Sequence, residues 1–188
     1  MAPSPPTITL QPVRTSPGKP DYQALLSWEF ASEPFYQGQI PRLLQSDIPH
    51  RVNYGSGFVW VYRDANNDTV GFGTLDVCEE YERFTGGKFH PYIPLLAVHP
   101  KFQRRGHGRR IVDHLIGEAV SFARNAPSMS NRLFLDVYKA NEAAISLYQS
   151  CGFTLLNPEN PIPDCGENNE PYFIMARSVA VVAASGVE

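Results

Sequence analysis

The chain has 188 residues and a formal net charge of −3, and 43% of its residues are hydrophobic and 12% aromatic. This length and composition predict a soluble globular protein and exclude a chain that is disordered throughout. No apolar run approaches the roughly 18 to 20 residues that a membrane-spanning helix needs, and the start lacks the basic segment and apolar core of a signal peptide. We therefore expect a cytoplasmic protein without a membrane partner.

The three cysteines argue against a disulfide framework. Cys78, Cys151 and Cys165 are an odd number and lack the close pairing of a metal knuckle, so we expect reduced thiols and no metal site. No histidine stands beside Cys78 or Cys151 in the sequence, so a covalent relay through either thiol has no support.

Prolines mark the less regular parts of the chain. There are 17, about twice the usual share of roughly 5%, and six of them lie in the first 20 residues. A second group lies between Pro158 and Pro171 and predicts a structured late loop. The small apolar residues of 179–188 show no periodicity. We expect a flexible arm over 1–20, a single domain over 21–178 and a loose tail over 179–188.

In the first half of the chain, hydrophobic spacing predicts two short helices, a β-hairpin and a further strand. In chain order these are helices at 21–30 and 35–44, hairpin strands at 58–62 and 70–75 around a turn at 64–68, and a strand at 92–98. Pro94 stands inside the last strand, where it removes a ladder hydrogen bond. It therefore predicts a bulge or a splayed pairing at this point.

The second half begins with the clearest helix of the chain. Its apolar residues recur at the spacing of one helical face: Ile111, Val112, Leu115, Ile116, Ala119, Val120 and Ala123. The elements expected after it are a buried strand at 132–137, a helix at 141–150 and strands at 153–156 and 172–176. This order predicts a mixed sheet with helices on its faces, an α/β (α+β) domain.

The segment between the strand 92–98 and this helix has the features of a pyrophosphate site. Gly106 and Gly108 allow a ligand close to the backbone, and the first N–H groups of the helix lack intrahelical partners. Five Lys or Arg residues and one His lie between positions 101 and 110 of an otherwise acidic chain. A P-loop is excluded because its motif is missing, and a dinucleotide fingerprint because Ile111 replaces its third glycine. One basic loop is too little for a nucleic-acid surface.

Two motifs together carry a family resemblance. The first is the loop Gln103-Arg104-Arg105-Gly106-His107-Gly108, and the second is the N-x-x-A-x-x-x-Y-x-x-x-G-F segment at 141–153. With the strand before the loop, they resemble the GNAT superfamily of acetyl-CoA-dependent N-acetyltransferases over about residues 70–156. The resemblance implies a mixed, mostly antiparallel central sheet with helices on both faces. It also implies a V-shaped splay between the fourth strand, 92–98, and the fifth, 132–137. The resemblance does not extend to the first 50 residues.

The resemblance implies acetyl-CoA as cosubstrate and assigns residues to it. The pantetheine arm would pair with the backbone of Leu96, Ala97 and Val98 like an added strand. The remaining residues expected to bind the cosubstrate are Gln103, Arg104, Arg105, Gly106, His107, Gly108, Arg109, Asn141 and Tyr148. Asn141 is also a favoured N-cap residue. Which basic side chain reaches the 3′-phosphate stays open.

The resemblance also assigns catalytic candidates. Tyr148 would protonate the departing thiolate, and a backbone N–H near Val98 would stabilise the oxyanion. The alternative for Tyr148 is a packed core aromatic. The general base is open: Asp136 matches the place of a Glu in some members of the family, and Glu79 and Glu80 follow the hairpin, where acceptor amines enter.

Several further points on the acceptor side are open. The acidic group Glu79, Glu80 and Glu82 suits a cationic acceptor or is a solvated face, and His90 and His99 are further titratable candidates. The segments 28–36 and 158–171 are expected to shape the acceptor pocket.

The expected activity is transfer of an acetyl group to a primary amine by direct attack in a ternary complex. The acceptor is a small-molecule amine or a peptide or protein amine, and the alternative is a catalytically silent acyl-CoA binder. Dimers are common among proteins of this kind, so a homodimer is one expected state.

Overall fold

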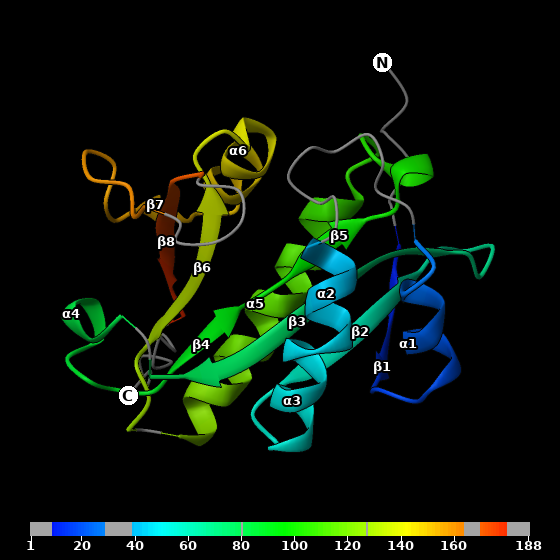
Figure 1. Cartoon of the computed structure of the whole chain (residues 1–188), viewed down its shortest axis with the longest axis horizontal. Helices are drawn as coiled ribbons and strands as arrows, with labels where there is room; N and C mark the ends of the chain where they lie inside the picture. Colours follow the sequence, from blue (N-terminus) through cyan, green and yellow to red (C-terminus); the bar gives the residue numbers. More distant parts are fainter. Residues whose placement is uncertain (1–8, 29–38, 80, 127, 164–169, 180–188) are drawn as a thin grey trace, which may run out of the picture.

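The computed structural model describes residues 9–28, 39–79, 81–126, 128–163 and 170–179 (Figure 1). These residues form an eight-stranded sheet in the order β1-β2-β3-β4-β6-β8-β7, with β5 paired to β3. The strands are β1 (Gln11–Thr15), β2 (Phe58–Arg63), β3 (Thr69–Cys78), β4 (His90–Ile93), β5 (Leu96–Val98), β6 (Arg132–Tyr138), β7 (Thr154–Leu155) and β8 (Tyr172–Ser178). The pair β4 and β6 is parallel and the other pairs are antiparallel, so the predicted mostly antiparallel mixed sheet is confirmed.

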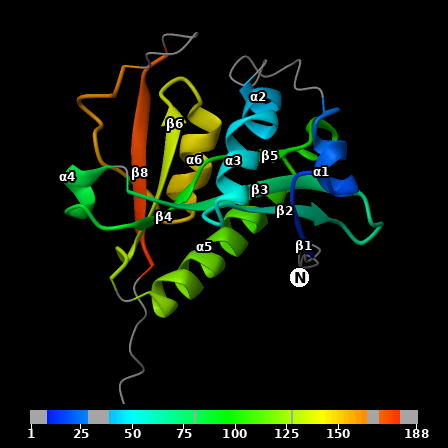
Figure 2. The same ribbon diagram turned by 60° about the horizontal axis from the view of Figure 1, so that its bottom comes forward.

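Helices cover both faces of this sheet, as expected (Figure 2). They are α1 (Pro20–Leu25), α2 (Gln39–Gln45), α3 (Asp47–Asn53), α4 (Glu82–Thr85), α5 (His107–Asn125) and α6 (Glu142–Ser150), with a 3₁₀ turn at Pro100–Phe102. One core joins α1, α2 and α3 to β2, β3 and β5, and a second joins α5 and α6 to the opposite face. Within the described ranges, no helix is long and apolar enough to cross a bilayer.

The N-terminal residues differ from the loose arm that the prolines predict. Gln11–Thr15 form β1, which pairs antiparallel with β2 at the edge of the sheet. An edge strand tolerates Pro12 because one of its sides needs no ladder partner. Residues 1–8 and 180–188 lie outside the described residues, and the division of the chain into domain, arm and tail stays a prediction.

The predicted strand at 92–98 is broken at Pro94 into β4 and β5. Tyr92 lies opposite Asp76 of β3, whereas Leu96 lies opposite Gly73. Continuing the second register places Leu95 opposite Thr74, so two residues of the broken strand face the single Leu75. This is a β-bulge, which bends a strand and shifts its register by one residue. The bulge predicted at Pro94 is confirmed.

Candidate functional site

The bulge separates β5 from β6 and leaves a slot between them. β4 runs parallel to β6 up to the pair Ile93 and Leu135, whereas β5 pairs with β3 instead. Two cavities occupy the slot: the loop cavity, about 390 Å³, beside the glycine loop, and the sheet cavity, about 340 Å³, beside Pro94. Leu96, Asn141, Ala144 and Tyr148 line both of them, so the two cavities meet. The predicted V-shaped splay is therefore present and open.

The loop cavity gathers most of the residues that the family resemblance assigns to the cosubstrate. Those that line it are Leu96, Ala97, Val98, Gln103, Arg104, Gly106, His107, Gly108, Arg109, Asn141 and Tyr148. Arg105 is not among its lining residues; its guanidinium lies 5.7 Å from the ring centre of Phe102. The local pattern of strand, glycine loop and helix thus folds as one wall of a single cavity.

The backbone of β5 alternates between β3 and the slot. Thr74 N–H donates to the Leu95 carbonyl at 2.9 Å, and His99 N–H donates to the Val70 carbonyl at 2.9 Å. Because alternate residues of a strand turn their backbone groups to the same side, Leu95, Ala97 and His99 face β3. Leu96 and Val98 therefore turn their N–H and C=O groups into the slot. Of the three residues expected to pair with the pantetheine arm, two, Leu96 and Val98, have backbone groups that face the slot.

The glycine loop presents unpaired donors to the loop cavity. Gly106 is the N-cap of α5 with a φ of 80°, and no side chain among the described residues caps this helix. A left-handed N-cap suits glycine, and the uncapped first turn leaves N–H groups for an anion. The basic side chains around it are exposed: Lys101, Arg104, Arg105, Arg109 and Arg110. This end of the cavity can therefore hold a phosphate or pyrophosphate.

The two histidines near the loop both have a lowered pKa. Burial lowers the pKa of His107, and the positive charge of Arg105 lowers it further. Burial also lowers the pKa of His99, whose Nδ1 accepts the N–H of Lys101 at 3.2 Å. Both shifts favour the neutral ring, and His99 caps the 3₁₀ turn at Pro100–Phe102.

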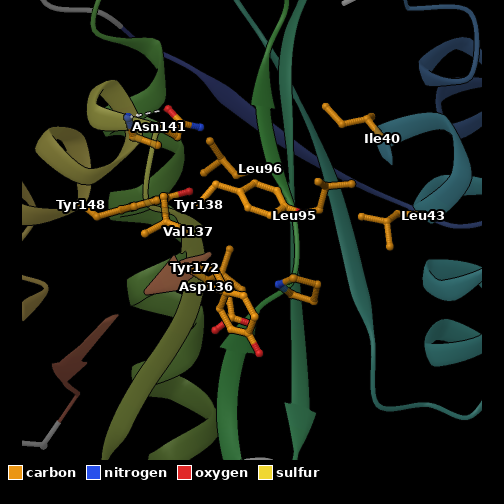
Figure 3. Close-up of a pocket in the computed structure, with 13 residues that line it drawn as sticks. Ile40, Leu43, Leu95, Leu96, Asp136, Val137, Tyr138, Asn141, Tyr148 and Tyr172 are labelled. Carbon is orange, nitrogen blue, oxygen red and sulfur yellow. Dashed lines mark hydrogen bonds between the residues drawn. The ribbon is translucent and has the colours of Figure 1, made fainter. Parts of the chain in front are cut away.

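Helix α6 forms the opposite wall of the slot. Asn141 caps it through Oδ1, which accepts the N–H of Ala144 at 3.1 Å. Tyr148, only 8% exposed, packs against Phe153 with ring centres 5.8 Å apart. In Figure 3 the hydroxyl of Tyr148 points into the slot, toward the side where Leu95 and Leu96 lie. Packing and access to the cavities therefore coexist at this residue.

The cap makes a direct prediction about stability. Replacing Asn141 by Ala leaves the N–H of Ala144 without its cap, and we expect the free energy of unfolding to fall by about 1 kcal/mol. Asn141→Asp keeps the accepting oxygen and should restore most of the loss. Urea denaturation of the three proteins measures this. Equal stabilities for Asn141→Ala and wild type would contradict a capping role.

Asp136 is the carboxylate that lines the sheet cavity. Its Oδ2 accepts hydrogen bonds from the hydroxyls of Tyr81 at 2.5 Å and Tyr92 at 3.0 Å. Two donors on one oxygen fix the orientation of the carboxylate. Glu79 is exposed and lines neither cavity, and Glu82 is exposed on α4. Glu80 lies outside the described residues, as does most of the segment 28–36.

The sequence analysis did not predict the tyrosines that surround this carboxylate. Tyr138 and Tyr172 line the sheet cavity from β6 and β8, where the register places them opposite each other. One signal was available: Asp136 and Tyr138 are two residues apart on a strand and share a face. The contacts of Tyr81 and Tyr92 join distant parts of the chain and leave no local pattern.

The structure also pairs a thiol with a histidine that is distant in sequence. Cys78 Sγ lies 3.2 Å from Nε2 of His90, its neighbour across β3 and β4. His90 is fully buried against Phe134, with ring centres 4.6 Å apart. Cys78 lines neither cavity, so this pair stands outside the slot.

Comparison with known proteins agrees with this geometry. The sequence model of the acetyltransferase (GNAT) family matches residues 22–153. A [ribosomal protein bS18]-alanine N-acetyltransferase of Salmonella typhimurium is 36% identical over 86 residues, which are 46% of this chain and 54% of the relative. The chain thus spans about half the length of the curated relatives of this kind that it matches.

Solved structures show the same fold. The spermidine N-acetyltransferase from Vibrio cholerae, in complex with CoA and spermine, aligns with a TM-score of 0.61 at 15% identity, over 90% of this chain and 95% of that one. The ribosomal-protein-S18-alanine N-acetyltransferase from Escherichia coli aligns with a TM-score of 0.58 at 21% identity, over 95% and 100%. With the family match across most of its length, the chain belongs to the GNAT acetyltransferase family.

Proposed function

We propose that this protein is an N-acetyltransferase that moves an acetyl group from acetyl-CoA to a primary amine. The observation that carries the proposal is the junction of the two cavities at Asn141 and Tyr148. A thioester whose CoA fills the loop cavity would place its carbonyl where the sheet cavity begins. The relatives are named as N-acetyltransferases of a ribosomal-protein alanine and of spermidine, and both of those acceptors are amines.

The donor side of the proposal follows from charge and backbone direction. The pyrophosphate would lie at the N-terminus of α5, where the helix dipole and the uncapped N–H groups favour an anion. The pantetheine arm would add to the open edge of β5 through Leu96 and Val98. The carbonyl of Val98 already accepts a hydrogen bond from Nε2 of Gln103 at 3.3 Å, which steadies this edge.

The chemistry is a direct displacement in a ternary complex. The neutral amine attacks the thioester carbon, its nitrogen forms the new C–N bond, and the C–S bond breaks. Asp136 takes the proton that the amine releases, and Tyr148 gives a proton to the departing thiolate. When the amine attacks, negative charge develops on the carbonyl oxygen. A slot-facing N–H of β5 stabilises this oxyanion until the C–S bond breaks. One proton thus leaves the nitrogen and one reaches the sulfur, and proton exchange with solvent then restores the Asp136 carboxylate and the Tyr148 phenol.

The acceptor side suits an amine on an apolar or aromatic body. Ile40 and Leu43 of α2 and Leu95, which directly precedes β5, line the sheet cavity opposite Tyr138 and Tyr172 (Figure 3). Such walls bury carbon atoms, and the Asp136 carboxylate attracts the amine. This description covers a small-molecule amine and a peptide α-amine or side-chain amine alike.

A binding and turnover experiment tests the proposal. Acetyl-CoA at 100 times its Kd should stabilise the fold by about 2.7 kcal/mol through mass action, visible as a raised Tm. The same sample is then followed for thiol release with spermidine, a monoamine, a lysine peptide and a peptide with N-terminal alanine. A shift with release supports the proposal and identifies the acceptor. A shift without release on any amine favours a silent acyl-CoA binder, and no shift contradicts the proposal.

A further inference from the structure

One buried hydroxyl occupies the bulge that opens the slot. Thr74 of β3, 1% exposed, lies opposite Leu95, the residue that follows Pro94. Its Oγ1 accepts the N–H of Leu95 at 2.9 Å and donates to the carbonyl of Leu95 at 3.0 Å. The same carbonyl accepts the backbone N–H of Thr74 at 2.9 Å. In a regular antiparallel pair the N–H of Leu95 would bond to the backbone carbonyl of Thr74, so a side chain has taken a main-chain position.

This side-chain hydrogen bond, in place of a main-chain one, fixes which residues after Pro94 turn their backbone groups into the slot. Without the extra residue, the alternation of β4 would continue and Leu95 and Ala97 would turn into the slot. With the bulge, Leu95 turns to Thr74, and Leu96 and Val98 turn into the slot. Pro94 permits the bulge because it has no N–H to satisfy. Thr74 then holds Leu95, whose buried N–H would otherwise lose its hydrogen bond.

We propose that Thr74 is a positioning residue for the pantetheine arm: its hydroxyl locks the bulge and thereby aims the backbone groups of Leu96 and Val98 at the cosubstrate. The inference rests on the proposed function. Thr74 touches neither cavity, so it acts only through β5. Its effect should therefore be confined to the arm and should spare the phosphate end of the ligand.

Two ligands can test the phosphate end and the pantetheine end of the slot independently. CoA fills both, whereas adenosine 3′,5′-bisphosphate has the phosphate end without the pantetheine arm. Thr74→Val keeps the shape of the side chain and removes the hydroxyl. By calorimetry we expect it to raise the Kd of CoA about tenfold and to leave the Kd of the bisphosphate within about twofold. Thr74→Ser keeps the hydroxyl and should bind both ligands like wild type.

Thr15 offers a matched control. It is also a buried threonine on a strand, and for its Oγ1 no hydrogen-bond partner is found among the described residues. Thr15→Val should change neither dissociation constant. Equal weakening of both ligands by Thr74→Val would indicate general damage to the fold and overturn the inference, and so would a CoA affinity that stays unchanged.

Amide exchange tests the same lock in the wild-type protein, with no dependence on how a variant folds. The N–H of Leu95 should be protected with and without ligand. The N–H groups of Leu96 and Val98 should gain protection with CoA and stay open with the bisphosphate. Fast exchange at the N–H of Leu95 would overturn this inference and leave the proposed function untouched. A wild-type protein that binds neither ligand contradicts the proposed function and, with it, this inference.

Discussion

Replacing Tyr148 by Phe is expected to lower kcat by about 10²- to 10³-fold while the Kd of CoA changes little. The phenol hydroxyl points into the slot where the two cavities meet, and the proposed reaction needs an acid for the departing thiolate. The ring itself packs against Phe153, and phenylalanine keeps that contact. Steady-state thiol release gives kcat, and calorimetry with CoA gives the dissociation constant.

Tyr62→Phe is the control for this experiment. Tyr62 is another buried tyrosine, but its hydroxyl bonds to Nδ1 of His114 at 3.0 Å in the core beside α5. Its loss should reduce stability and leave kcat close to wild type. If Tyr148→Phe turned over acetyl-CoA at the wild-type rate, the hydroxyl would have no part in the chemistry and Tyr148 would be a packing residue.

Replacing Asp136 by Asn is expected to lower kcat/KM by about 10²-fold near neutral pH. Asparagine keeps an oxygen that can accept from Tyr81 and Tyr92 but cannot take a proton from the amine. The deficit should persist as the pH rises past the acceptor's own pKa, about 10.4 for a lysine-like amine and near 8 for an α-amine, since the nitrogen of a neutral amine still releases a proton when it attacks the thioester. A pH profile of kcat/KM for both proteins measures the deficit.

Glu79→Gln provides the comparison. It removes one negative charge from an exposed residue that lines neither cavity, and its profile should overlay that of wild type. A loss at Glu79 equal to that at Asp136 would move the general base to the end of β3. A deficit for Asp136→Asn that vanishes once the amine is neutral would point to electrostatic attraction of the ammonium form of the acceptor instead of proton removal.

The elements predicted from sequence are those whose signals are local. The alternation and turn formers of 58–75 gave the hairpin, the one-sided apolar repeat from Ile111 gave α5, and Asn141 marked the cap of α6. Pro94 indicated the bulge because proline alone lacks the donor that a ladder needs. In each case the interactions that determine the element join residues within about one helical turn or one pair of neighbouring strands.

The remaining features depend on contacts that no window of sequence contains. β1 is a strand because β2 lies beside it, and α3, with Pro49 in its first turn, packs against β2 and β3. The hydroxyls of Tyr81 and Tyr92 meet Asp136 across 55 and 44 residues of chain. The sheet cavity is lined mainly by segments that are distant in the sequence, so the sequence indicated the residues of the loop cavity better than those of the sheet cavity.

The open edge of β5 has a kinetic consequence. If the proposed function is correct, Leu96 and Val98 bind the pantetheine arm through their peptide groups. These hydrogen bonds are the same whether or not the sulfur at the end of the arm carries an acetyl group. Binding of this kind is uniform between substrate and product. Free CoA should thus compete with acetyl-CoA at similar concentrations, so that the rate in a cell would follow the ratio of acetylated to free CoA and not the amount of acetyl-CoA alone.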